Sequence, residues 1–100
     1  MKIIETKTED FIQLSVEGRV DTTTSPELQQ MILAAFQKGN YVILDFEKVD
    51  YVSSAGLRAL LLGEKTAKSK GGRMVLRNVQ RSVNEVFHMS GFSSILTIEP

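Results

Sequence analysis

The sequence predicts an α/β fold, a single domain in which helices pack against a mixed β-sheet with an N-terminal hairpin. Segments of strand character alternate with amphipathic helical segments from residue 25 onward, which is typical of parallel strands joined by helical crossovers. Two strand-like segments precede the first helix with a short turn between them, which indicates an antiparallel hairpin. The length of 100 residues fits one domain, so we expect residues 1–100 to form it.

The hairpin is predicted from the first 17 residues. Residues 2–7 form a brief strand of mixed polarity, and Glu9 and Asp10 supply the turn. Residues 11–17 alternate between apolar and polar side chains over most of their length. This alternation predicts that one face of the second strand lies in the core and the other faces solvent.

The first helix follows a polar loop and begins near Ser25. Pro26 suits the first helical position, and either Thr24 or Ser25 is expected to cap it. The apolar side chains form one stripe at helical spacing: Leu28, Met31, Ile32, Ala35 and Phe36. Lys38 and then Gly39 predict the end of the helix, with the glycine in a left-handed turn.

The middle of the chain predicts a buried strand, a loop and a second helix. Residues 41–46 are nearly all apolar, as in a central strand covered on both faces. Residues 47–52 follow this run with three charged side chains and are predicted to form a loop. The second helix is expected from residues 53–56 to the stop at 70–72, with its buried side marked by Leu57, Leu60, Leu61 and Ala67.

The last third predicts a strand, a helix and a strand. Residues 73–77 form the first of these, and Ser82 with Glu85 matches a capping box for the third helix. Residues 90–92 close that helix, and residues 94–99 form the final short strand. The apolar residues assigned to the core here are Met74, Val83, Val86, Phe87 and Met89.

The composition excludes several classes of function. Twelve basic and twelve acidic residues cancel, which argues against nucleic acid as a partner and leaves the oligomeric state open. The absence of cysteine excludes disulfides and thiolate chemistry. The single histidine, His88, has no companions at ligand spacing, so we expect no metal and no cofactor. With no long apolar run and no signal peptide, we expect a cytoplasmic protein without membrane insertion.

The segment from Asp50 to Arg58 carries the strongest functional signal. It joins an apolar strand to a helix whose first amide groups lack partners and whose dipole adds about half a positive charge. Small side chains at 53–56 leave this helix end open to an anion. Two interpretations follow from position alone. Ser53 caps the helix, or Ser54 accepts a phosphate that adds about −1.5 to −2 charges.

Residues 51–58, YVSSAGLR, resemble the signature of the STAS domain family, and more narrowly that of the bacterial anti-sigma factor antagonists. Residues 18–21 (GRVD) resemble the family's loop before its first helix. Residues 71–74 (GGRM) resemble its turn into the fourth strand, and residues 86–91 (VFHMSG) the end of its third helix. Because the four segments keep the family's order, the resemblance spans nearly the whole chain.

The resemblance implies a cycle in which Ser54 is phosphorylated by a partner that is both anti-sigma factor and serine kinase. The unphosphorylated antagonist binds this kinase and releases the sigma factor, and a serine phosphatase resets the modified form. The family commonly has Asp immediately before the acceptor, where this chain has Ser53. Ser53 is therefore a second possible acceptor, and the family's register favours Ser54.

The predicted partner surface joins the loop before the first helix to the start of the second: Asp21, Thr22, Thr23, Ser53, Ser54, Gly56, Leu57 and Arg58. Asp21 has two interpretations, a turn residue or part of the kinase-facing surface. Arg58 has three, because it can pair with a partner carboxylate, help to hold a phosphate or remain solvated.

Two other functions compete with this one. A hydrolase would need glycine two residues before a nucleophilic Ser54, where the chain has Val52, and it would have His88 as its only histidine base. We therefore do not expect an enzyme. The resemblance also allows a non-enzymatic subunit of a lipid-transport ATPase or of a stress-signalling assembly. A neighbouring gene for a serine kinase or for a transporter would discriminate between these.

Overall fold

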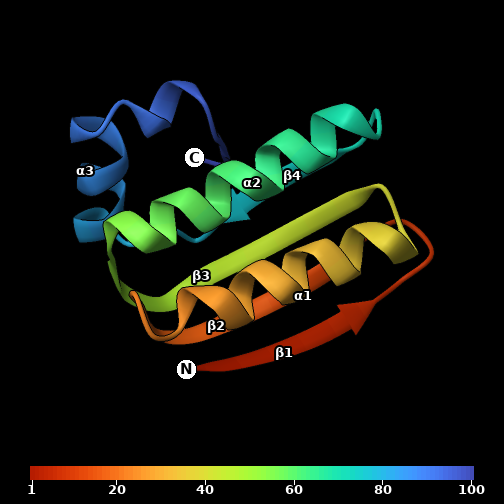
Figure 1. The fold of residues 1–100 in the computed structure, drawn as a ribbon, viewed down its shortest axis with the longest axis horizontal. Coiled ribbons are helices and arrows are strands. Elements are labelled where there is room, and N and C mark those ends of the chain that lie inside the picture. Colours follow the sequence, from red (N-terminus) through yellow and green to blue (C-terminus); the bar gives the residue numbers. More distant parts are fainter.

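A five-stranded sheet carries three helices in the computed structural model, which describes residues 1–100 (Figure 1). The strand order is β1-β2-β3-β4-β5; β1 pairs antiparallel with β2, and the other neighbours are parallel. The predicted fold class and hairpin are confirmed. In chain order the elements are β1 (Lys2–Lys7), β2 (Ile12–Val20), α1 (Ser25–Lys38), β3 (Tyr41–Val52), α2 (Ser54–Ser69), β4 (Arg73–Arg77), α3 (Arg81–Met89), a short 3-10 turn (Phe92–Ser94) and β5 (Thr97–Ile98).

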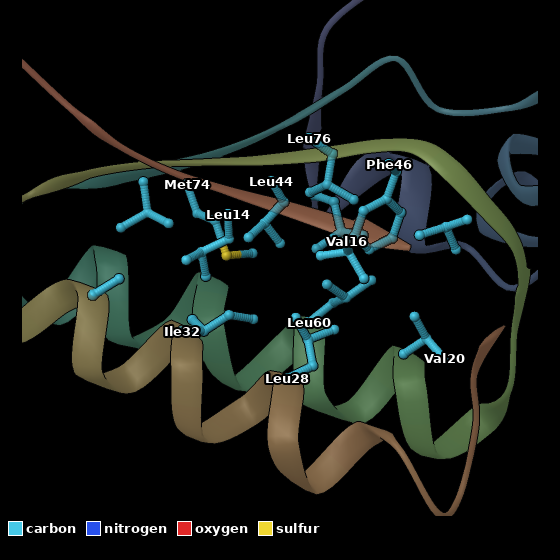
Figure 2. Packing of buried hydrophobic residues seen from close by; sticks show 14 of the residues in the cluster. Leu14, Val16, Val20, Leu28, Ile32, Leu44, Phe46, Leu60, Met74 and Leu76 are labelled. Carbon is cyan, nitrogen blue, oxygen red and sulfur yellow. The ribbon is translucent and has the colours of Figure 1, made fainter. Parts of the chain in front are cut away.

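The helices α1 and α2 lie side by side over one face of the sheet, and both begin at the same end of it (Figure 1). The core fills the layer between them and the strands (Figure 2). Each side chain buried here contributes about 1.5–3 kcal/mol relative to exposure. The fully buried side chains drawn there include Leu14, Leu28, Ile32, Leu44, Leu60 and Leu76.

The predicted loop at residues 47–52 is wrong, because β3 continues to Val52. The pairing of β2 with β3 shifts register twice, between Ser15 and Glu17 and between Gly18 and Arg19. Such irregularities change which side chains face the core. The buried side chains of this stretch, Val49 and Val52, are consequently three residues apart, so the alternation expected of a strand is absent from the sequence.

Three predicted helix caps differ from the structure. Thr24 precedes α1 without a side-chain capping hydrogen bond, and Gly39 is extended, with φ −171°, rather than left-handed. The capping box is wrong, since α3 begins at Arg81 after Gln80 and Ser82 already lies within the helix. Helix α1 nevertheless begins at Ser25 and ends at Lys38 as predicted, so only its capping differs, whereas α3 begins before Ser82. Gly91 does adopt a left-handed φ of 82°, which ends α3 as expected.

Several residues assigned to the core lie elsewhere. Val86 is 36% exposed and Met89 is 88% exposed, because only one narrow side of α3 packs inward through Val83 and Phe87. In α2, Leu60 and Ala67 are buried as predicted, whereas Leu57 and Leu61 are half-buried.

The final strand is shorter than expected, since residues 92–94 form the 3-10 turn and only Thr97–Ile98 pair with β4. None of the helices combines the length and the apolar character needed to cross a membrane.

Candidate functional site

The ends of β2 and β3 bring the two predicted site segments together. The Ser53 amide donates to the Val20 carbonyl at 2.8 Å, one residue after Val20 and Val52 pair across the strands. The loop that leads into α1 and the turn that leads into α2 therefore lie at the same end of the sheet (Figure 1). A surface built from both segments is geometrically continuous.

Ser53 is the N-cap of α2. Its Oγ accepts a hydrogen bond from the Gly56 amide at 3.3 Å, and its carbonyl accepts one from Leu57 at 2.9 Å. The interpretation of Ser53 as a capping residue is confirmed. Ser and Asp both serve well at this position, so the helix keeps a capping oxygen although it lacks a carboxylate there.

Ser54 is the first residue of α2 and is exposed. Its hydroxyl makes no hydrogen bond within the chain, unlike that of Ser53. Amide groups in a first helical turn lack intrahelical partners, and the first turn of α2 contains no acidic residue. A negative group on Ser54 would thus gain about 0.3–1 kcal/mol from the helix dipole.

Gly56 is buried rather than part of the surface. A Cβ atom placed on it would lie 2.9 Å from each of Val20 Cγ1, the Val20 carbonyl oxygen and Val52 Cγ1. The start of α2 therefore sits directly against the ends of β2 and β3, and Figure 2 shows Val20 beside it. Glycine at this position allows the close approach that holds Ser53 and Ser54 in place.

Asp21 organises the loop before α1. Its Oδ1 accepts hydrogen bonds from the Thr23 hydroxyl at 2.8 Å, the Thr23 amide at 3.0 Å and the Thr24 amide at 3.1 Å. The Thr24 hydroxyl in turn donates to the Arg19 carbonyl at 2.7 Å. The bond from the Thr23 hydroxyl, followed by that from the Thr24 amide, lowers the pKa of Asp21. The turn interpretation of Asp21 is thereby confirmed, and a role toward a partner stays a prediction.

The remaining predicted site residues differ in exposure. Thr22, Thr23 and Arg58 are exposed, and Arg58 forms no ion pair within the chain. Leu57 is half-buried and packs against the core. These predicted residues consequently offer small hydroxyls, the unpaired cation of Arg58 and part of one apolar side chain.

Sequence reasoning did not assign Arg19 and Tyr51 to the site. They are Cα partners across β2 and β3, and the guanidinium carbon of Arg19 lies 4.0 Å from the centroid of the Tyr51 ring. The sequence prediction ended this strand at residue 46. A prediction that continued it to residue 52 and gave its register with β2 would have placed Arg19 and Tyr51 opposite each other. No surface hollow includes any residue of this end; the four that exist lie elsewhere.

The chain is similar to known proteins along nearly its whole length. The family model described as STAS domain matches residues 2–100. BtrV of Bordetella bronchiseptica, a candidate anti-sigma factor antagonist, is 35% identical over 99 residues, which is 98% of this chain and 85% of BtrV. The anti-sigma-B factor antagonist of Bacillus subtilis strain 168 is 26% identical over 90 residues, covering 90% of this chain and 83% of that protein.

The fold is shared with SpoIIAA, an anti-sigma factor antagonist and cell fate determinant of Bacillus. Its unphosphorylated form superimposes with a TM-score of 0.82 at 20% identity, covering 99% of this chain and 89% of that one. Its phosphorylated form gives a TM-score of 0.75 at 20% identity, covering 99% of this chain and 92% of that one. The match over residues 2–100 and the 35% identity to BtrV show that the chain belongs to the STAS domain family, as a member of the anti-sigma factor antagonist type.

Proposed function

We propose that the chain is an anti-sigma factor antagonist that switches partners through phosphorylation of Ser54. In its unphosphorylated form it binds an anti-sigma factor that is also a serine kinase, in the cytoplasm, and so frees the sigma factor. The kinase transfers phosphate to Ser54, the complex dissociates, and a serine phosphatase restores the binding form. In this cycle the chain is a substrate and a binding module, and it performs no catalytic step of its own.

The observation that carries the proposal is the difference between two adjacent serines. Ser54 is exposed and its hydroxyl is free, whereas the Ser53 oxygen caps α2 through the Gly56 amide at 3.3 Å. Phosphorylation of Ser53 would disrupt that capping hydrogen bond, which typically contributes about 1 kcal/mol to stability. Modifying Ser54 breaks no hydrogen bond of the chain. Ser54 is therefore the acceptor that the fold tolerates.

The phosphate is expected to act on the interface and to leave the fold intact. At the start of α2 its charge is compatible with the helix dipole, and no acidic side chain in the first turn opposes it. In a complex the same group would be desolvated and would repel nearby negative charge on the partner. Binding is thus weakened while the domain stays folded, as a reversible switch requires.

The shape of this end supports a protein partner. The Asp21 loop is held by local hydrogen bonds, so little entropy is lost when it is covered. The end lacks a hollow of the kind that encloses a small ligand. Exposed hydroxyls beside a partly exposed leucine are compatible with the rim of a transient protein interface.

The test is intact-mass spectrometry after incubation with ATP and each anti-sigma-type serine kinase of the source organism. The wild type should gain one phosphate, Ser54→Ala none, and Ser53→Asp one. Ser53→Asp is the matched control because it keeps a capping oxygen but removes the second hydroxyl. Incorporation that persists in Ser54→Ala would refute the acceptor. No incorporation by any active kinase would favour a constitutive scaffold.

A further inference from the structure

A cation–aromatic pair lies at the end of the sheet that carries Ser54. Arg19 and Tyr51 face each other across β2 and β3, with the guanidinium carbon 4.0 Å from the ring centroid. The Arg19 side chain is 61% exposed and Tyr51 is 40% exposed. Tyr51 is one of the few large apolar residues of the chain that remain this accessible.

Arg19 forms one long ion pair within the chain, with Asp21, and leaves its hydrogen-bond donors unpaired. The Asp21 carboxylate is the nearest anion to Arg19, but its Oδ2 lies 3.8 Å from Nε, beyond hydrogen-bonding distance. The other Asp21 oxygen is already occupied by Thr23 and Thr24. Neither the Arg19 guanidinium nor the Tyr51 hydroxyl donates a hydrogen bond to another residue of the chain. The ring therefore holds the guanidinium in position while its N–H groups stay available.

This arrangement suits one kind of ligand group. A planar guanidinium binds a carboxylate through two parallel hydrogen bonds, which a lysine does not reproduce. Stacking on an aromatic ring orders the arginine before binding, so less side-chain entropy is lost in the complex. Arginine and tyrosine are also the residue types that most often dominate interface energies. The pair is suited to a partner segment that presents an Asp or Glu side chain.

The pair is continuous with the surface proposed above. Arg19 is two residues before Asp21, and Tyr51 is three before Ser54. The 2.8 Å hydrogen bond from Ser53 to Val20 ties the two chain segments together at this point. We propose that Arg19 and Tyr51 form an anchor of the kinase interface, at which Arg19 binds a carboxylate of the partner and Tyr51 packs beside it. This inference rests on the proposed function and extends the interface beyond the residues predicted from sequence.

The chain contains a matched control. Arg73 lies over the Tyr41 ring at 4.5 Å, and these two residues pair across β3 and β4. Tyr41 is the first residue of β3, whereas Tyr51 is its second to last, so the two pairs occupy opposite ends of the same strand. They share residue types and a guanidinium over the ring, at 4.0 Å and 4.5 Å, and they differ in position. Tyr41 also packs edge-on against Phe11, with the ring centroids 6.2 Å apart. An effect caused by loss of stacking alone would appear in both pairs.

The experiment measures the dissociation constant of the unphosphorylated chain for its kinase by isothermal titration calorimetry. Arg19→Ala and Tyr51→Ala should each weaken binding at least about tenfold, as interface anchors do. Arg19→Lys keeps the charge but should still weaken binding, because the bidentate geometry is lost. Arg73→Ala and Tyr41→Ala should stay within about twofold of the wild type, as expected of residues outside an interface. Thermal melts establish that each variant is folded at the assay temperature.

The outcomes separate this inference from the proposed function. If the wild type binds and phosphorylation weakens it, but the Arg19 and Tyr51 variants bind as tightly as the wild type, the anchor is refuted and the switch stands. If the wild type binds no kinase, both fail. The carboxylate is tested separately, since binding of the wild type should weaken with salt more steeply than that of Arg19→Ala. Equal salt dependence would exclude an ionic partner. Self-association that is lost in Tyr51→Ala, measured by sedimentation, would assign the pair to a second copy instead.

Discussion

Gly56→Ala tests whether the close approach of α2 to the sheet positions Ser54, the proposed acceptor. The added methyl group would sit 2.9 Å from two valine methyl groups and from the Val20 carbonyl oxygen. The carbonyl belongs to the backbone of β2 and cannot rotate away as a side chain can. The start of α2 must therefore move, and the hydrogen bond from Ser53 to Val20 lies at that start.

The cost follows from two opposing terms. Overpacking a filled site typically costs about 1–3 kcal/mol. Replacing glycine by alanine inside a helix recovers about 0.5–1 kcal/mol. We expect a net loss of about 1–2 kcal/mol in the free energy of unfolding, because the backbone contact at Gly56 leaves little room for relaxation. In a domain of this length, each kcal/mol of lost stability lowers the melting temperature by about 4–8 °C.

Urea denaturation followed by circular dichroism measures this loss, and Gly63→Ala is the matched control. Its new Cβ would meet the Met74 sulfur at 2.7 Å and Ile32 Cγ2 at 3.0 Å, both on side chains. Methionine adapts readily to such crowding, so Gly63→Ala should cost less than Gly56→Ala. A Gly56→Ala protein as stable as the wild type, or more stable than Gly63→Ala, would refute the packing argument.

Three further changes have expected outcomes. Ser53→Ala should lower the free energy of unfolding by about 1 kcal/mol in urea denaturation, whereas Ser53→Asp should retain it, because only alanine lacks a capping oxygen. The hydrogen bonds that Asp21 accepts in the folded state lower its pKa from the ordinary value of 3.8. The ionised carboxylate therefore stabilises the folded state above that value, and this stabilisation is lost as the pH falls through the folded pKa. Between pH 6 and pH 2.5 the melting temperature of Asp21→Asn should accordingly fall less steeply than that of the wild type. Equal slopes of melting temperature against pH in the two proteins would contradict the hydrogen-bonded turn. Met89→Ser should change the free energy of unfolding by no more than about 0.5 kcal/mol, because Met89 is 88% exposed. A clear drop in the melting temperature would show that the Met89 side chain packs against the domain.

The local signals in the sequence predicted most of the fold. Alternation in residues 11–17 and the apolar run of residues 41–46 identified β2 and β3. The small residues at the junction before α2 identified the open helix end at which Ser54 lies. The bonds of Asp21 also reach only two or three residues along the chain, which is why a turn role was foreseeable.

Other features depended on contacts between distant segments. The end of β3 is set by its pairing with β2, and the register shifts there hide the strand from any test of alternation. Arg19 and Tyr51 meet only because that pairing continues to the last residues of both strands. The exposure of Met89 likewise depends on which side of α3 faces the sheet.

By itself, the sequence determined the order of elements, the hairpin and the serine at the start of α2. These depend on periodicity and capping, which act within a single turn or strand. The tertiary structure decided which serine caps the helix, that Gly56 is buried, and that an arginine stacks on Tyr51 at the same end of the sheet. Those outcomes depend on strand register and on the distance between packed elements, and neither is contained in the spacing of residues along one segment.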